Sequence, residues 1–125
     1  MKIKRVDSLV IYTQNLARSA RFYHEVFDLP LVSQTKTAQT FHLGHQLLHL
    51  RSLEDVQLPP QSKTPGSLCL SIVAADCKEA ILNHCKSYFV PIVQVNEQTT
   101  GADGACWSII LQDPDENLIE VITYK

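Results

Sequence analysis

Four residues with reactive side chains occupy equivalent places in the two halves of this chain. With a shift of 71 residues, the segment Leu-Leu-His-Leu that contains His49 falls on the segment Leu-Ile-Glu-Val that contains Glu120. With a shift of 61 residues, Ser8 falls on Cys69. Imidazole and carboxylate groups serve as general acids and bases, and with a thiolate they are also metal ligands. The sequence therefore contains a candidate site, provided that equivalent positions of the two halves meet.

The repeat that creates these pairs extends over most of the chain. At a shift of 61, residues 8–11 fall on residues 69–72, and residues 29–32 fall on residues 90–93. The larger shift near the C-terminus means that the second copy has 10 additional residues, most simply around residues 99–105. A repeat of this length indicates two copies of one supersecondary unit, neither of which buries its apolar face alone.

The first copy reads as one helix and four strands. A β-branched strand over residues 6–12 precedes a helix over residues 16–28, for which Asn15 is a good N-cap. Pro30 ends the helix, because a residue before proline is pushed out of the α region. Short alternating segments complete this copy, over residues 31–33, 40–43 and 47–51.

The second copy gives the same β-α-β-β-β reading. A strand over residues 68–73 precedes a helix over residues 77–89, with Asp76 and Glu79 as a capping box and Pro91 beyond the end. The last three strands are expected over residues 92–95, 107–112 and 118–124. The chain is thus expected to be one domain by size, with module one over residues 1–52, a proline-rich linker over 53–66 and module two over 67–125.

Composition excludes several classes of function. Charged residues make up 19% of the chain and the formal net charge is -2, which gives no electrostatic footprint for nucleic acid. No apolar stretch approaches the ~20 residues that span a membrane, and no signal peptide is evident at the start. The four cysteines show no C-x-x-C spacing, so free thiols in a cytoplasmic protein are favoured over disulfides.

Strand alternation sorts the side chains onto two faces of the predicted sheet. One face is aliphatic and is expected to pack under the helices: Leu9, Ile11, Leu48, Leu50, Leu70, Ile72, Ile119 and Val121. The opposite face mixes polar and apolar groups: Ser8, Val10, Tyr12, Leu47, His49, Arg51, Cys69, Ser71, Val73, Leu118, Glu120 and Ile122. We interpret this mixed face as a concave ligand surface, the alternative being the solvated side of a sheet.

The chain resembles the vicinal-oxygen-chelate superfamily. This superfamily includes glyoxalase I, bleomycin-resistance proteins, fosfomycin-resistance enzymes and extradiol dioxygenases. The matching segments are residues 6–10, residues 20–23 with Leu29 and Pro30, and residues 113–120. The last reads Asp-Pro-Asp-Glu-Asn-Leu-Ile-Glu, close to the D-P-D-G-N-x-x-E hairpin of the family. Glu116 stands where the family usually has glycine, so we expect some strain in this turn.

The resemblance implies an architecture and an assembly. The expected fold is α+β, with two βαβββ modules forming a cupped, mixed eight-stranded sheet and both helices on its convex side. Relatives usually form dimers, and open sheet edges are consistent with this, so a homodimer is expected.

The resemblance also implies where a metal would bind. Relatives that use a metal hold it with a histidine and a glutamate from each module, at the positions of Ser8, His49, Cys69 and Glu120 in this chain. Only Glu120 keeps the residue of the family, Ser8 is a poor ligand, and Cys69 is a soft donor that favours zinc over nickel, manganese or iron. We therefore expect the metal site to be lost and no cofactor to be bound, with zinc as the alternative.

Three classes of function remain open. The first is a metal-independent protein that binds a small hydrophobic or planar molecule. The second is a divergent lyase or dioxygenase-like enzyme that uses Glu120 and His49. The third is an interaction module. The alternative for Glu120 is a structural pairing with Arg51 or His49. Neither nucleic acid nor a membrane is an expected partner. The predicted ligand pocket consists of Ser8, Val10, Tyr12, His49, Arg51, Cys69, Ser71, Glu120 and Ile122.

Overall fold

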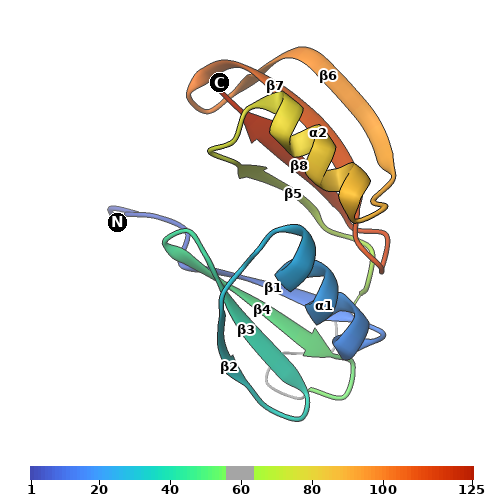
Figure 1. The fold of residues 1–125 in the computed structure, drawn as a ribbon. Helices are drawn as coiled ribbons and strands as arrows, with labels where there is room; N and C mark the ends of the chain where they lie inside the picture. Colours follow the sequence, from blue (N-terminus) through green and yellow to red (C-terminus); the bar gives the residue numbers. More distant parts are fainter. Residues whose placement is uncertain (56–63) are drawn as a thin grey trace. The chain divides into compact units, whose positions relative to one another are not determined.

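The computed structural model describes residues 1–55 and 64–125, which fall into two compact units, Met1–Gly66 and Ser67–Lys125. Each unit holds one four-stranded sheet and one helix (Figure 1). The first unit contains β1 (Ser8–Thr13), α1 (Leu16–Val26), β2 (Leu31–Gln34), β3 (Ala38–Leu43) and β4 (Gln46–Ser52). The second contains β5 (Cys69–Val73), α2 (Lys78–Ser87), β6 (Ile92–Gly101), β7 (Gly104–Gln112) and β8 (Leu118–Thr123).

The two units share one topology. The strand order is β1-β4-β3-β2 in the first sheet and β5-β8-β7-β6 in the second. In each, the first strand pairs in parallel with the last, and the other neighbours are antiparallel. The register also repeats, because Val10 pairs with His49 and Ser71 pairs with Glu120. The predicted α+β class, built from two βαβββ modules with eight strands, is confirmed, and the strands form two four-stranded sheets.

The predicted linker is described only in part. Pro59 and Pro60 lie outside the described residues. Asp55, near the start of this segment, is buried and accepts a hydrogen bond from the Thr37 hydroxyl at 3.0 Å. Asp55 is also tied to the end of β4, where its backbone N–H donates to the carbonyl of Ser52.

The additional residues of the second copy lengthen one hairpin. Strands β6 and β7 have 10 and 9 residues, whereas the equivalent β2 and β3 have 4 and 6. Near the tip of this hairpin, the Tyr124 hydroxyl accepts a hydrogen bond from the backbone N–H of Asp103 at 3.0 Å. A Cβ atom at Gly101 would clash with that hydroxyl, so a larger residue there would displace the Tyr124 side chain.

The two helices begin differently. The Asn15 side chain caps α1 as predicted, accepting a hydrogen bond from the backbone N–H of Arg18 at 3.1 Å. The predicted capping box of α2 is wrong, because Cys77 is the N-cap and makes no side-chain cap bond. Asp76 instead belongs to the connection that precedes the helix, where its carbonyl accepts the Thr123 hydroxyl at 2.6 Å.

Both helices end earlier than the proline positions indicated. Asp28 and Phe89, which are equivalent in the repeat, have positive φ angles of 53° and 54° and so cannot continue a right-handed helix. After α2, the N–H of Phe89 donates to the carbonyl of Lys86, and the N–H of Val90 donates to that of Cys85. This is the Schellman arrangement, which usually places glycine where Phe89 stands.

The core of each unit lies between its helix and one face of its sheet. In the first unit α1 packs against β3 and β4 (Figure 1). The Tyr23 ring of α1 lies against Phe22 and Phe27. The aliphatic positions predicted to face the helices include the most buried strand residues: Leu48, Leu50 and Ile119 are at most 1% exposed. Trp107 on β7 is also buried, with 6% of its surface exposed.

The Asp-Pro-Asp-Glu-Asn turn between β7 and β8 is a network of hydrogen bonds. Asp113 Oδ1 accepts the backbone N–H groups of Asp115 and Asn117 at 2.9 Å, and Oδ2 accepts the Asn117 side-chain amide at 2.8 Å. The Asn117 Oδ1 atom in turn accepts the backbone N–H of Leu68 at 2.9 Å. Glu116 has a φ of 72°, which agrees with the expected strain. The motif therefore fixes the hairpin and ties it to the start of β5.

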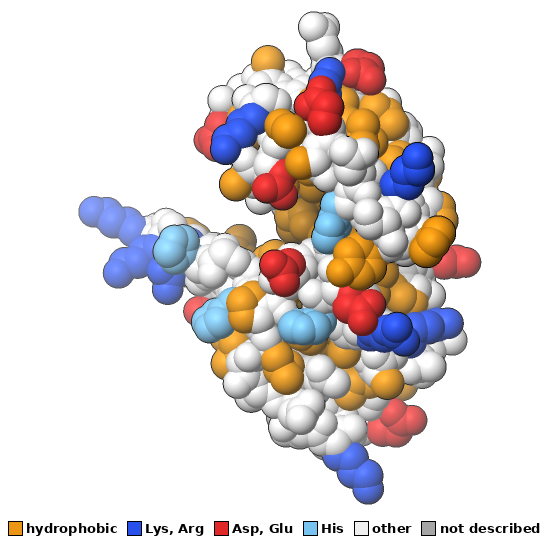
Figure 2. Space-filling model, in the orientation of Figure 1, with side chains coloured by type: hydrophobic (Ala, Val, Ile, Leu, Met, Phe, Trp, Pro, Cys, Tyr) orange, Lys and Arg blue, Asp and Glu red, His pale blue; other side chains and the backbone are white. Residues whose placement is uncertain are grey.

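The surface combines charged and apolar groups. On the face drawn in Figure 2, Lys, Arg, Asp and Glu side chains are interspersed with apolar ones. By sequence, the first unit has eight Lys and Arg residues against five Asp and Glu, whereas the second has three against eight. None of the helices in the described residues is long and apolar enough to span a membrane.

Candidate ligand-binding faces

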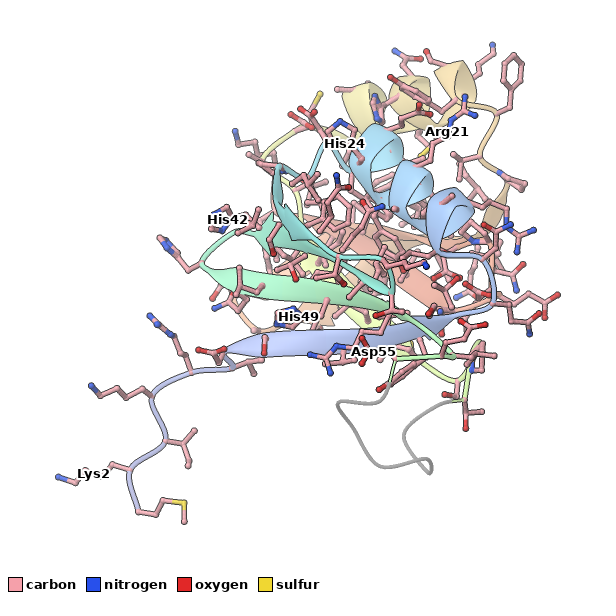
Figure 3. All side chains as sticks on the ribbon, turned by 90° about the horizontal axis from the view of Figure 1, so that it is seen from below. Lys2, Arg21, His24, His42, His49 and Asp55 are labelled. Carbon is pink, nitrogen blue, oxygen red and sulfur yellow. The ribbon has the colours of Figure 1, made fainter. Side chains whose placement is uncertain are left out.

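The candidate site residues lie on the sheet face opposite the one that packs against the helix. We call this face the mixed face of each unit. Figure 3 shows His49 on the side of the first sheet away from α1, which carries the labelled Arg21 and His24. On the first mixed face Ser8, Val10, Leu47, His49 and Arg51 are half-buried and Tyr12 is buried. On the second, Leu118 and Glu120 are half-buried, Ile122 is buried, and Cys69, Ser71 and Val73 are exposed.

His49 is the central polar residue of the first mixed face. It pairs with Val10 on β1 and with Thr40 on β3. Its Nδ1 atom lies 2.8 Å from the Thr40 hydroxyl, with either atom as the donor. Since no other hydrogen bond of this ring is found within residues 1–55 and 64–125, Nε2 is left for a ligand. The hydrogen bond with Thr40 therefore sets the orientation of the ring.

The electrostatic surroundings favour the neutral form of His49. Burial lowers its pKa below the ordinary value of 6.5, and the positive charge of Arg51 lowers it further. The negative charge of Asp7 acts in the opposite direction and is the smallest of the three effects. A neutral imidazole can accept or donate one hydrogen bond at Nε2, depending on its tautomer.

This lowered pKa predicts a loss of stability in acid. Between the folded-state pKa of His49 and 6.5, the unfolded chain binds more protons than the folded one, so the free energy of unfolding falls as the pH falls through that window. Urea unfolding between about pH 8 and pH 5 should show a smaller acid loss in His49→Gln than in the wild type. His45→Gln, which changes an exposed histidine in the β3–β4 turn, is the control and should follow the wild type. Parallel curves for the wild type and His49→Gln would contradict the assignment.

Glu120 is the central polar residue of the second mixed face. Its Oε1 atom accepts the hydroxyl of Ser71 on β5 at 2.6 Å, and Oε2 accepts the hydroxyl of Ser108 on β7 at 2.7 Å. The serines come from the two strands that flank β8, so the carboxylate is held from both sides. The sequence suggests Arg51 or His49 as partners of Glu120. In the structure, the hydrogen bonds to Glu120 come instead from serines of the same unit.

The network continues to the edge of the sheet. The Asn96 side-chain amide donates to Ser108 Oγ at 3.0 Å, and that of Gln94 donates to Asn96 Oδ1 at 2.6 Å. One polar chain thus crosses all four strands of the second unit, and Ser108 at its centre is fully buried. Sequence reasoning missed Ser108, Asn96 and Thr40. The available signal was a lone serine inside the apolar run of β7.

The side chains at the four family ligand positions do not suit a hard divalent ion. Ser8 offers a neutral hydroxyl and Cys69 a soft sulfur, where such ions prefer nitrogen or charged oxygen. Among the residues that the structure describes, no three His, Cys, Asp or Glu side chains form a group that could hold a metal ion.

Comparisons with known proteins agree with the fold. The sequence profile of the Glyoxalase/Bleomycin resistance protein/Dioxygenase superfamily matches residues 5–121. Virulence protein STM3117 of Salmonella typhimurium is 31% identical over 125 residues, which cover 99% of this chain and 87% of that protein.

Solved structures give the same result. The integron cassette protein VCH_CASS1 from the mobile metagenome of V. cholerae has a TM-score of 0.90 at 32% identity. The match covers 100% of this chain and 98% of the cassette protein. A lactoylglutathione lyase from Agrobacterium tumefaciens has a TM-score of 0.79 at 20% identity, covers 98% and 96%, and bears on the fold alone. With a family profile that spans nearly all of its length, this chain belongs to the Glyoxalase/Bleomycin resistance protein/Dioxygenase superfamily.

Proposed function

We propose that this protein binds a small planar or hydrophobic molecule on its mixed faces without a metal ion. The observation that carries the proposal is the composition of these faces. Half-buried apolar side chains such as Val10 and Leu118 lie beside polar groups whose orientation is fixed by hydrogen bonds. Small-molecule sites combine mostly apolar walls with a few placed polar groups, and both components are present here.

The donor chemistry supports the metal-independent form of this proposal. A bound hard cation would need several oxygen or nitrogen ligands, and the substitutions at Ser8 and Cys69 remove two of them. His49 and Glu120 are instead engaged by hydroxyl groups of their own sheets, at Thr40 in one unit and at Ser71 and Ser108 in the other. Such bonds fix the orientation of the two side chains on their sheet faces, as a site for an organic ligand requires.

The test uses acridone, a neutral planar tricyclic compound, as a fluorescent probe. Acridone should bind saturably to the purified protein, with a Kd on the order of micromolar, and treatment with EDTA should leave that Kd unchanged. Elemental analysis should find no stoichiometric nickel, manganese, iron or zinc. Val10→Gln and Leu118→Gln should weaken binding, whereas Phe89→Gln, at a 92% exposed position after α2, should not.

Two results would overturn the proposal. One is the absence of saturable acridone binding. The other is binding that disappears with EDTA and returns with one metal ion per chain, which would favour the metal-dependent enzyme. In that case metal content should fall in Glu120→Gln and His49→Ala.

A further inference from the structure

We infer that the mixed face of the second unit recognises a positively charged nitrogen on its ligand, with Glu120 as the acceptor. The inference rests on the proposed function and names the chemical class of the ligand: a planar, mostly apolar molecule that carries an ammonium group or a protonated ring nitrogen. It follows from the direction of the hydrogen bonds around Glu120, from the charge of that residue and from the apolar groups beside it.

The direction of the hydrogen bonds can be assigned. An amide nitrogen only donates, so Asn96 Nδ2 donates to Ser108 Oγ, and the hydroxyl proton of Ser108 is directed to Glu120. Ser71 donates to the other carboxylate oxygen. The polar chain thus runs from Gln94 toward Glu120 and ends on a group that can only accept. Each carboxylate oxygen has a second lone pair, and a further partner for Glu120 must therefore be a donor.

The charge of Glu120 is not matched by a cation of its own sheet. Arg21 pairs with Glu25 at 3.1 Å on the exposed face of α1, and no ion pair to Glu120 is found within residues 1–55 and 64–125. Two neutral hydroxyl groups satisfy hydrogen bonds but do not neutralise a carboxylate. A half-buried charge without an opposite charge in its own sheet is costly. A cationic ligand would supply the opposite charge that Glu120 lacks in its own sheet.

The surroundings favour the same class of ligand. The second unit carries eight Asp and Glu residues against three Lys and Arg, so its field attracts cations. Glu120 pairs across the sheet with Ile110, and Leu118 and Ile122 precede and follow it on the same face of β8. An ammonium group at Glu120 would therefore have apolar side chains beside it, where a planar ring can lie.

The experiment compares three acridines that share one ring system. At neutral pH 9-aminoacridine is a cation, acridone is neutral, and acridine-9-carboxylate is an anion. The wild-type protein should bind the cation about five- to tenfold more tightly than acridone, as expected for one half-exposed charge-assisted hydrogen bond, and the anion more weakly than either. Glu120→Gln should abolish the preference for the cation, so that this variant binds 9-aminoacridine no more tightly than acridone.

Glu97→Gln is the matched control, because it removes the same charge from an exposed position on β6 of the same unit. It should leave the preference for the cation within about twofold of the wild type. If the wild type binds the three acridines equally, or if the two variants lose the preference equally, the inference is wrong while the proposed function stands. If acridone itself does not bind, the proposed function fails first. The comparison within the wild type decides the matter even if Glu120→Gln does not fold.

Discussion

Leu48→Ala should lower the free energy of unfolding by about 3 to 5 kcal/mol, because it opens a cavity in a fully packed site. Leu48 is 1% exposed and lies on the helix-facing side of β4, against which α1 packs. Leu47→Ala removes the same atoms from the adjacent residue, which lies half-buried on the mixed face. It should cost less than about 1.5 kcal/mol, since much of that side chain already contacts solvent. The two variants lose the same atoms and differ only in which face of the sheet loses them.

Urea unfolding at a fixed pH measures both variants, and the second copy provides a replicate. Ile119→Ala should be as damaging as Leu48→Ala, and Leu118→Ala as mild as Leu47→Ala, because the repeat places them equivalently. A reversed order within a pair would mean that the strand is shifted by one residue, which turns every side chain to the other face. His49 and Glu120 would then face the helices, and the ligand-binding proposal would lose its basis.

The parts of the fold that follow from periodicity were predictable. A strand alternates with period two and a buried face tolerates only apolar groups, so the pattern around Leu48 and Ile119 identified the core side of both sheets. The internal repeat then gave the second unit from the first. The helix ends were harder to predict, because Asp28 and Phe89 adopt positive φ angles without the glycine that usually marks such positions.

The partners of Glu120 could not be predicted in the same way. Ser108 lies twelve residues earlier on β7, and its position opposite β8 depends on the register set by a five-residue turn. Asn96 reaches it across a hairpin with register shifts between Ile92 and Gln94 and between Asn96 and Thr99, which the sequence does not signal. Without these pairings, Arg51 and His49 were the evident polar neighbours on the mixed face. Periodicity assigns a residue to a face, whereas hydrogen-bond partners require the register.

Asp113→Ala should lower the free energy of unfolding by about 2 to 4 kcal/mol, because three hydrogen bonds to a buried carboxylate are lost together. The backbone N–H groups of Asp115 and Asn117 and the side-chain amide of Asn117 would be left without this acceptor. The loss would also loosen the bond from Leu68 to Asn117, which ties the turn to the start of β5. Thermal and urea unfolding of the variant measure the effect.

Two further variants of the same turn make the prediction specific. Asp113→Asn keeps one oxygen for the backbone N–H groups but places an amide against the amide of Asn117, so its cost should lie between those of the wild type and Asp113→Ala. Glu116→Gly should act in the opposite direction and stabilise the protein by about 0.5 to 1 kcal/mol, because glycine adopts a φ of 72° without strain. If Asp113→Ala left the free energy of unfolding unchanged, the hydrogen bonds of Asp113 would not be what holds this hairpin.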